Sequence, residues 1–216
     1  MNDKEIKNSI KYWNEVYTAF NKDQIKYDNW LDNFNDIIVK CNTPILDLGC
    51  GRGNNVLTLL NKSKEVIPCD ISENAIKNVK RIFPEIKEAK CFNMIDGLPF
   101  DDNSFEIIIA DLSLHYFREK DTKNIIFELK RVLKINGYLI VRVNSINNLN
   151  HGAGQGEEIE YHLYKTKEGI LKRFFDEADV RRFFMDFEIK YIKEELMTRH
   201  KLPKLHWCIC MQLKNK

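Results

Sequence analysis

An acid followed by evenly spaced glycines is the first group of residues whose types and spacing indicate chemistry. Asp47 is followed at every second position by a glycine, at 49, 51 and 53. Residues 45–48 are apolar apart from the acid and predict a short buried strand, and residues 56–60 begin a helix. A strand that enters a helix through glycine backbone lets a ligand lie against main-chain N–H groups and the helix N-terminus.

A second acid stands at the end of the next expected strand. Residues 65–70 form an apolar run that ends in Asp70, 23 residues after Asp47. Ser72 then predicts the N-cap of a helix that Pro84 ends. A carboxylate at the carboxyl end of a strand can accept hydrogen bonds from both ribose hydroxyls of an adenosine. Asp70 therefore indicates a bound nucleoside, without deciding which cofactor carries it.

The spacing of the glycines distinguishes between cofactors. A dinucleotide fingerprint requires glycine at the first, third and sixth positions, and the sixth position here is Asn54. The pattern Asp-x-Gly-x-Gly-x-Gly instead resembles motif I of the class I S-adenosylmethionine-dependent methyltransferases. Later stretches are similar to the same family: Leu-Pro-Phe at 98–100, Leu-His-Tyr-Phe at 114–117, and Arg-Val-Leu-Lys at 131–134 before a glycine turn. The resemblance covers residues 44–144 and is greatest to small-molecule members, including the tellurite-resistance type.

The resemblance implies that S-adenosylmethionine is the cofactor and indicates where it binds. The expected contacts come from an N-terminal helix, the glycine loop, the acid at 70, the turn after the third strand and the loop after the fourth. These residues are Tyr17, Asp47, Gly49, Cys50, Gly51, Asn55, Asp70, Ile71, Asn93, Met94, Ile95, Asp111, Leu112 and Tyr116. Tyr12 and Trp13 are expected to help Tyr17 cover the cofactor.

The residue that recognises the adenine is left open. Relatives usually place an acid after the third strand, but Asn93 and Met94 occupy those positions. Asn93 can accept the bond from the adenine amino group, Asp96 can take its place, or backbone groups of Met94 and Ile95 can contact the ring edge. Asp96 is also a typical turn residue beside Gly97.

The acceptor side offers candidates but no assigned catalytic residue. In the resembling family the loop after the fourth strand faces the methyl acceptor, which makes His115 and Tyr116 candidates. Residues 145–172 are polar and rich in glycine and predict a flexible loop on the substrate side, of the kind that can act as a lid. The candidates in this loop and directly after it are His151, Tyr161, His162 and Arg173. Arg199 and His200 are given no role.

The order of elements predicts the fold class. An amphipathic helical region over 4–35, four strand–helix units, a helix over 176–184 and closing strands over 187–196 and 205–213 predict an α/β sandwich with a mainly parallel sheet. The helix over 120–134 is expected to end at Asn136-Gly137. The resemblance implies a three-layer, Rossmann-like sandwich of seven strands with the last strand antiparallel. We expect one domain, 1–216, with a helical cover (1–40), a cofactor-binding core (44–144), the loop (145–172) and a closing unit (173–216).

Bulk properties narrow the class of protein. Lys and Arg total 34 against 32 Asp and Glu, a net charge of +2, and so neutral a balance disfavours a nucleic-acid partner. No secretory signal or membrane-spanning run is found. None of the six cysteines forms a Cys-x-x-Cys pair, so we expect no metal site and reduced thiols in a cytoplasmic protein.

The leading hypothesis is methyl transfer from S-adenosylmethionine to a small molecule. A module that binds the cofactor without catalysis is the alternative, because no residue type here is indispensable to the chemistry. An NAD-dependent oxidoreductase is a third hypothesis, which Asn54 disfavours.

Overall fold

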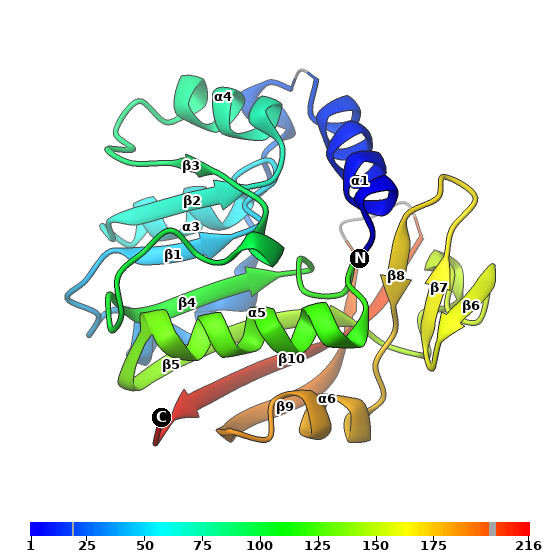
Figure 1. The fold of residues 1–216 in the computed structure, drawn as a ribbon. Coiled ribbons are helices and arrows are strands. Elements are labelled where there is room, and N and C mark those ends of the chain that lie inside the picture. Colours follow the sequence, from blue (N-terminus) through cyan, green and yellow to red (C-terminus); the bar gives the residue numbers. More distant parts are fainter. Residues whose placement is uncertain (19, 199–201) are drawn as a thin grey trace.

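The computed structural model describes residues 1–18, 20–198 and 202–216. Its centre is a seven-stranded sheet with the order β3-β2-β1-β4-β5-β10-β9 (Figure 1). The strands are β1 (Ile45–Leu48), β2 (Val66–Asp70), β3 (Lys90–Cys91), β4 (Phe105–Asp111), β5 (Leu133–Asn144), β9 (Phe187–Met197) and β10 (Lys204–Leu213). The pairs among β1 to β5 are parallel, whereas β10 lies antiparallel between β5 and β9. The expected seven strands and the inserted antiparallel last strand are confirmed.

Helices cover both faces of this sheet. One face packs α5 (Glu119–Val132) and α6 (Glu177–Phe183) against alternate strand residues such as Leu46 and Ile108. The other packs α2 (Asn35–Ile38), α3 (Asn54–Asn61) and α4 (Glu73–Ile82) against the intervening residues. In Figure 1 α5 lies in front of the strands and α3 behind them. The three-layer sandwich is therefore confirmed.

Pro68 lies inside β2 without breaking the ladder. The carbonyls of Glu65 and Cys69 accept bonds from the β1 side, so odd-numbered residues of β2 face β1. Pro68 therefore faces β3, and β3 pairs only with Cys69 and Asp70. Pro68 has no N–H to donate, and β3 is not yet paired with β2 at this position. No ladder hydrogen bond is therefore lost, which is why the sheet tolerates the proline.

The expected helical region over 4–35 is wrong beyond its first half. The helix α1 covers Asp3–Val16, and the chain then continues through two 3₁₀ turns, η1 (Lys22–Gln24) and η2 (Asn29–Phe34). The Thr18 hydroxyl donates to the carbonyls of Asn14 and Glu15, which satisfies the end of α1 locally. The apolar residues that continued the helical pattern are buried from irregular backbone instead.

The helix before β5 also ends earlier than expected. Its last residue is Val132, and Asn136 has a left-handed conformation (φ +65°) inside β5. The register between β4 and β5 shifts at this point. The Asn-Gly pair therefore marks an irregularity in the strand and not the end of the helix.

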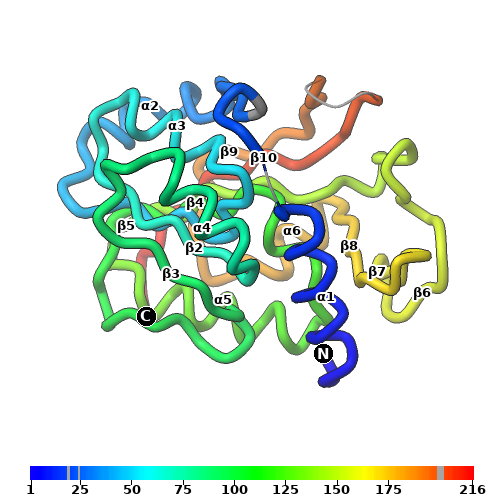
Figure 2. The backbone as a smooth tube through the Cα atoms, turned by 90° about the horizontal axis from the view of Figure 1, so that it is seen from above, coloured from blue at the N-terminus to red at the C-terminus, as the bar shows by residue number. Residues whose placement is uncertain are grey.

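Residues 145–172, expected as a flexible loop, contain a 3₁₀ turn and a second sheet. The turn η4 is Leu149–His151, and β6 (Glu157–Glu160), β7 (Leu163–Lys165) and β8 (Leu171–Arg173) pair antiparallel. Leu163 and Leu171 are buried, so the sheet has apolar contacts that its polar composition concealed. In Figure 2 α1 lies between this small sheet and the body of the large one. Among the described residues no helix is long and apolar enough to cross a membrane.

Candidate active site

A cavity of about 560 Å³ opens at the carboxyl ends of β1, β2 and β4, beneath α1. Its wall contains thirteen of the fourteen residues expected to contact the cofactor: Tyr17, Gly49, Cys50, Gly51, Asn55, Asp70, Ile71, Asn93, Met94, Ile95, Asp111, Leu112 and Tyr116. These residues come from five separate segments of the chain, and the fold brings them together. Their individual contacts with a cofactor remain predictions.

The glycine loop is shaped by close approaches as well as by backbone conformation. Gly49 (φ +82°) would place a Cβ 2.4 Å from the Ser113 side chain, and Gly51 (φ +51°) would place one 2.7 Å from the Tyr17 hydroxyl. The N–H groups of Gly49 and Cys50 donate to the Cys69 carbonyl at 2.7 and 2.9 Å, which fixes the loop against the end of β2. Only glycine fits at positions 49 and 51, because a Cβ there would collide with Ser113 or Tyr17. The cavity therefore keeps the space that side chains would fill.

Asp70 lies in the cavity wall and is 8% exposed. Its carboxylate accepts N–H bonds from Gly51 and Ser72, each at 2.9 Å, one on each oxygen. Burial raises the pKa of Asp70, and the two backbone bonds oppose that rise. Because each oxygen has a second lone pair, the carboxylate retains the capacity to accept two ribose hydroxyls. No described residue forms an ion pair with it, so its orientation suits the expected role.

Asp47 is the one expected cofactor residue outside the cavity wall. It is fully buried, Oδ1 accepts a bond from the Asn55 amide at 2.9 Å, and Oδ2 has no partner among the described residues. Burial raises its pKa to about 7, and the nearby Asp111 and Asp70 add to the effect. Asp47 therefore acts on the cavity through Asn55, which lines it and also accepts a bond from the Trp30 indole.

The three alternatives for adenine recognition are placed differently. Asn93, Met94 and Ile95 line the cavity, whereas Asp96 does not. The Asn93 side-chain oxygen accepts the Ile95 N–H at 3.3 Å and caps the short turn η3 (Met94–Asp96). Because this capping bond is long and Asp96 lies outside the wall, Asn93 and the backbone beside it remain the candidates for a hydrogen bond to the edge of the adenine ring.

The roof of the cavity is α1. Trp13 stacks on Tyr17 (5.7 Å between ring centroids) and meets Tyr116 edge-on (5.1 Å), whereas Tyr12 lies outside the wall. Ser9 is the only residue of α1 that is buried. The other side chains of this helix stay at least partly exposed where it crosses the cavity. The sequence did not identify several other wall residues: Met1, Ile6, Ser9, Val16, Lys26, Arg52, Asn54, Ser113, Phe117 and Lys204.

Polar contacts hold α1 at both ends. The N-terminal ammonium pairs with Asp121, and Glu5 accepts two bonds from Arg118, at 2.6 and 3.3 Å. At the other end the Asn14 side-chain oxygen accepts the Ser72 hydroxyl at 2.9 Å. The roof is therefore attached to α5 on one side of the cavity and to the start of α4 on the other.

The end of the cavity away from Asp70 contains a buried ion-pair network. Arg142 is 1% exposed and donates two bonds of 2.7 Å to Asp111 and one of 2.8 Å to Asp28. Burial lowers the pKa of Arg142, but the two carboxylates outweigh that effect and raise it. The guanidinium also lies 4.3 Å over the Trp30 ring. Arg142 therefore stays charged and fixes Asp111 in the wall.

Of the substrate-side candidates only Tyr116 reaches the cavity. His115 is fully buried behind the wall, with both ring nitrogens unpartnered among the described residues. Arg173 is buried in an ion pair with Glu160, at 2.7 Å, and Tyr161 is 65% exposed. The His151 ring bonds to the Leu202 carbonyl at 3.1 Å. None of these four side chains lines the cavity, and their roles toward a substrate remain predictions. Arg199 and His200 lie outside the described residues.

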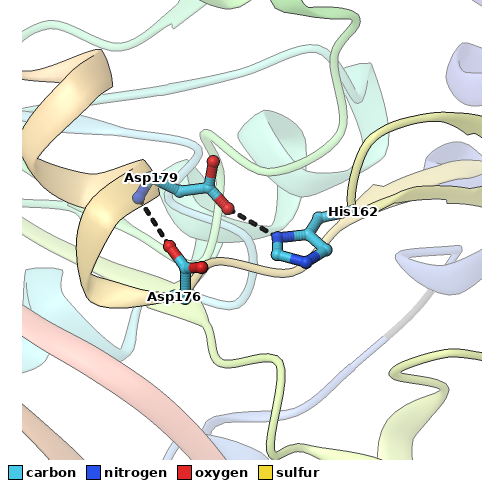
Figure 3. A group of neighbouring side chains, drawn as sticks. All are labelled: His162, Asp176 and Asp179. Atoms are coloured by element: carbon cyan, nitrogen blue, oxygen red, sulfur yellow. Dashed lines mark hydrogen bonds and ion pairs between the residues drawn. The ribbon is translucent and has the colours of Figure 1, made fainter.

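His162, the remaining candidate, contacts Asp179 in the first turn of α6, beside the N-cap residue Asp176 (Figure 3). Asp176 caps α6 by accepting the Asp179 N–H at 2.6 Å, and the Asp179 carboxylate contacts His162 Nδ1 at 2.6 Å. Their ligand-type atoms lie within 4.8 Å of one another, but Asp179 also accepts a bond from Arg182 at 3.0 Å. The cluster fastens the small sheet to α6 and lies away from the cavity.

The fold and the cavity define a Rossmann-like protein with an open cavity at the carboxyl edge of its sheet, where ligands bind in folds of this kind. Residues 46–141 match the family model described as a methyltransferase domain. A SAM-dependent methyltransferase from Methanosarcina mazei has a similar structure, with a TM-score of 0.68, 26% identity, and 80% of this chain and 93% of that one covered. Residues 46–141 therefore form a methyltransferase domain of the class I, S-adenosylmethionine-dependent type, and S-adenosylmethionine is the cofactor of this domain.

Curated relatives share part of their length with this chain. The tRNA N(3)-methylcytidine methyltransferase Mettl2 of Drosophila melanogaster is 29% identical, over 79% of this chain and 58% of its own length. The mitochondrial arginine-hydroxylase NDUFAF5 of Homo sapiens is 30% identical, over 64% of this chain and 40% of its own. The chain thus spans about half the length of these relatives, whose named reactions differ.

Proposed function

We propose that this protein transfers the methyl group of S-adenosylmethionine to a small-molecule acceptor. The observation that carries the proposal is the cavity that joins Asp70 and the glycine loop to a roofed acceptor end. The cofactor supplies a methyl on a sulfonium sulfur: the acceptor lone pair forms the new bond, the C–S bond breaks, and its electron pair stays on sulfur in S-adenosylhomocysteine. A proton that the acceptor carries leaves to solvent or to a base.

The residues of the chain have binding and positioning roles in this proposal. Asp70 holds the ribose, the backbone of Gly49 and Gly51 admits the cofactor closely, and Asn93 to Ile95 contact the adenine. Trp13, Tyr17 and Tyr116 cover the reacting groups and exclude water. Holding two reactants in line can lower the reaction barrier by roughly 7–11 kcal/mol at the upper end. An acceptor that is already deprotonated needs no general base, so no acid–base pair is essential for it.

A small acceptor is favoured over a nucleic acid by two features. The roof α1 crosses the cavity and is attached at both ends, and the net charge of the chain is only +2. The tRNA-modifying relative named above supports the rival acceptor.

The six cysteines are free thiols, five of them buried, and we place the enzyme in a reducing compartment such as the cytoplasm.

Calorimetry and turnover test the proposal together. We expect saturable binding of S-adenosylmethionine to the purified protein, and formation of S-adenosylhomocysteine when a pool of small acceptors is added. Unfractionated tRNA, added in a separate reaction, tests the rival acceptor. Binding without turnover in either reaction would support the non-catalytic module, and no binding at millimolar cofactor would contradict the proposal.

A further inference from the structure

The acceptor end of the cavity contains a lysine that methyl transfer by itself does not require. Lys204 is the first residue of β10, is 7% exposed, and lines the cavity together with Leu112, Ser113 and Tyr116. The β10–β5 register begins at His206 opposite Asn144, the last residue of β5. Lys204 therefore lies just past the carboxyl end of β5, on the side where the loop after β4 faces the acceptor.

The neighbouring acid does not present a free negative charge at this wall. Asp111 accepts two bonds of 2.7 Å from Arg142, so its carboxylate is held against a guanidinium. Arg142 also pairs with Asp28, which lies outside the cavity wall. An acceptor at this end therefore meets a paired carboxylate and an ammonium group.

A second ammonium group lies behind the same wall. The Lys172 ammonium donates to the His151 carbonyl at 2.7 Å, and β8, which carries Lys172, bonds to the backbone of His115 through the Arg173 N–H at 2.7 Å. Burial lowers the pKa of His115 well below its usual value, and Lys204 and Lys172 lower it further. The His115 ring is thus neutral and adds no charge of its own to this end of the cavity.

We propose that Lys204 selects a small acceptor that bears an anionic group, a carboxylate or a phosphate, and holds that group at this end of the cavity. The inference rests on the proposed methyl transfer and specifies its substrate class. An ammonium in a poorly solvated wall attracts an anion more strongly than one in water does, and the attraction is directional once a charge-assisted hydrogen bond forms. The positively charged sulfonium of the cofactor likewise favours a negatively charged group beside it.

The first test measures anion binding without turnover. Acetate and inorganic phosphate are titrated separately by calorimetry into protein saturated with S-adenosylhomocysteine, which occupies the cofactor end. We expect millimolar binding that weakens about tenfold or more in Lys204→Met and stays within about threefold in Lys204→Arg, which keeps the charge.

Lys64→Met is the matched control, because Lys64 lies outside the cavity wall and donates to the carbonyls of Val39 and Cys41. Its anion affinity should stay within about threefold of the parent, since the charge it removes does not line the cavity. Equal anion affinity in the parent and Lys204→Met, with unchanged affinity for S-adenosylhomocysteine, would overturn the inference. That second affinity reports on folding, and Lys204→Gln replaces the methionine variant if it fails to fold.

The second test uses acceptor pairs that differ only in the acidic group. Carboxylic acids and their methyl amides are compared by the S-adenosylhomocysteine they form. We expect the acids to exceed the amides by about tenfold in kcat/KM, and Lys204→Met to remove the advantage. Equal turnover of acids and amides, or methylation of tRNA alone, overturns the anionic small acceptor but leaves methyl transfer standing. Absence of cofactor binding would overturn the proposed function first.

Discussion

The glycine-loop end of the cavity is built from backbone, and the acceptor end is built from side chains. At the first end Gly49, Gly51 and the carboxyl end of β2 set the shape through main-chain conformation and N–H bonds. At the second end Tyr116, Lys204 and the Arg142–Asp111 pair come from three strands and the loop after β4. The comparison teaches that cofactor binding and acceptor recognition can share a cavity because they depend on different parts of the chain.

The largest expected effect comes from breaking the backbone end. Gly51→Val adds a side chain where a Cβ already meets the Tyr17 hydroxyl at 2.7 Å, so we expect cofactor binding to weaken more than about 100-fold. Calorimetry with S-adenosylhomocysteine measures it. Gly154→Val is the matched control, because Gly154 also has a positive φ (+70°) but nothing within 4 Å of the added Cβ. Similar losses in both variants would assign the effect to backbone strain and not to the cavity.

The next prediction removes the ribose acceptor. Asp70→Ala deletes two hydrogen bonds to a charged group, each worth about 1.5–3 kcal/mol and not additive, so we expect affinity for S-adenosylmethionine to fall by roughly 10- to 150-fold. Asp96→Ala, outside the cavity wall, should bind within about threefold of the parent. Parent-like affinity in Asp70→Ala, measured in the same titration, would show that the ribose lies elsewhere.

A third prediction concerns pH and the acid behind the glycine loop. The pKa of Asp47 is raised to about 7 from an ordinary 3.8, so between these values the folded protein holds a proton that the unfolded chain has lost. The free energy of unfolding therefore falls as pH rises through this window, and the loss is complete above pH 7. Asp47→Asn cannot ionise and should lack this fall, a difference of about 3 kcal/mol between pH 5 and 8. Urea unfolding at the two pH values measures it, and parallel profiles for parent and variant would refute it.

The smallest effect is expected where α1 is attached to the acceptor side. Arg118 pairs with Glu5 at 2.6 Å and with Glu160 at 3.6 Å, and its side chain is 32% exposed. Arg118→Gln should cost less than about 1 kcal/mol of stability, yet speed cofactor release a few-fold because the roof loses a tie. Lys123→Gln, which removes the Lys123–Glu119 pair on the same helix, should leave the release rate unchanged. Stopped-flow measurement of release compares the two, and equal rates would contradict a roof held by Arg118.

The backbone end was predictable from the sequence because glycine spacing and strand-ending acids are local signals. Asp70 and the loop from Gly49 to Gly51 follow directly from position along one strand–helix unit. The alternation of elements predicted a mainly parallel sheet, and the resemblance implied its seven strands with the last one antiparallel. Asp47 was the exception, since the sequence places it beside the loop but its side chain points behind the wall.

The acceptor end was not predictable to the same degree. Lys204 reaches the cavity only because β10 inserts antiparallel beside β5, a pairing between segments about 60 residues apart. His115 is adjacent to Tyr116 in sequence but faces the interior, where its pKa is lowered by burial. The small sheet of β6 to β8 was hidden by a polar composition because few of its residues are buried. Side-chain direction at loops follows tertiary packing, which motif spacing does not encode.

The most direct test of the central claim is a crystal structure with S-adenosylhomocysteine bound. We predict the adenosine in the cavity beneath α1, with both ribose hydroxyls within hydrogen-bonding distance of the Asp70 carboxylate and the homocysteine sulfur toward Tyr116 and Lys204. Ligand density outside this cavity, or an Asp70 carboxylate turned away from the ribose, would contradict the account.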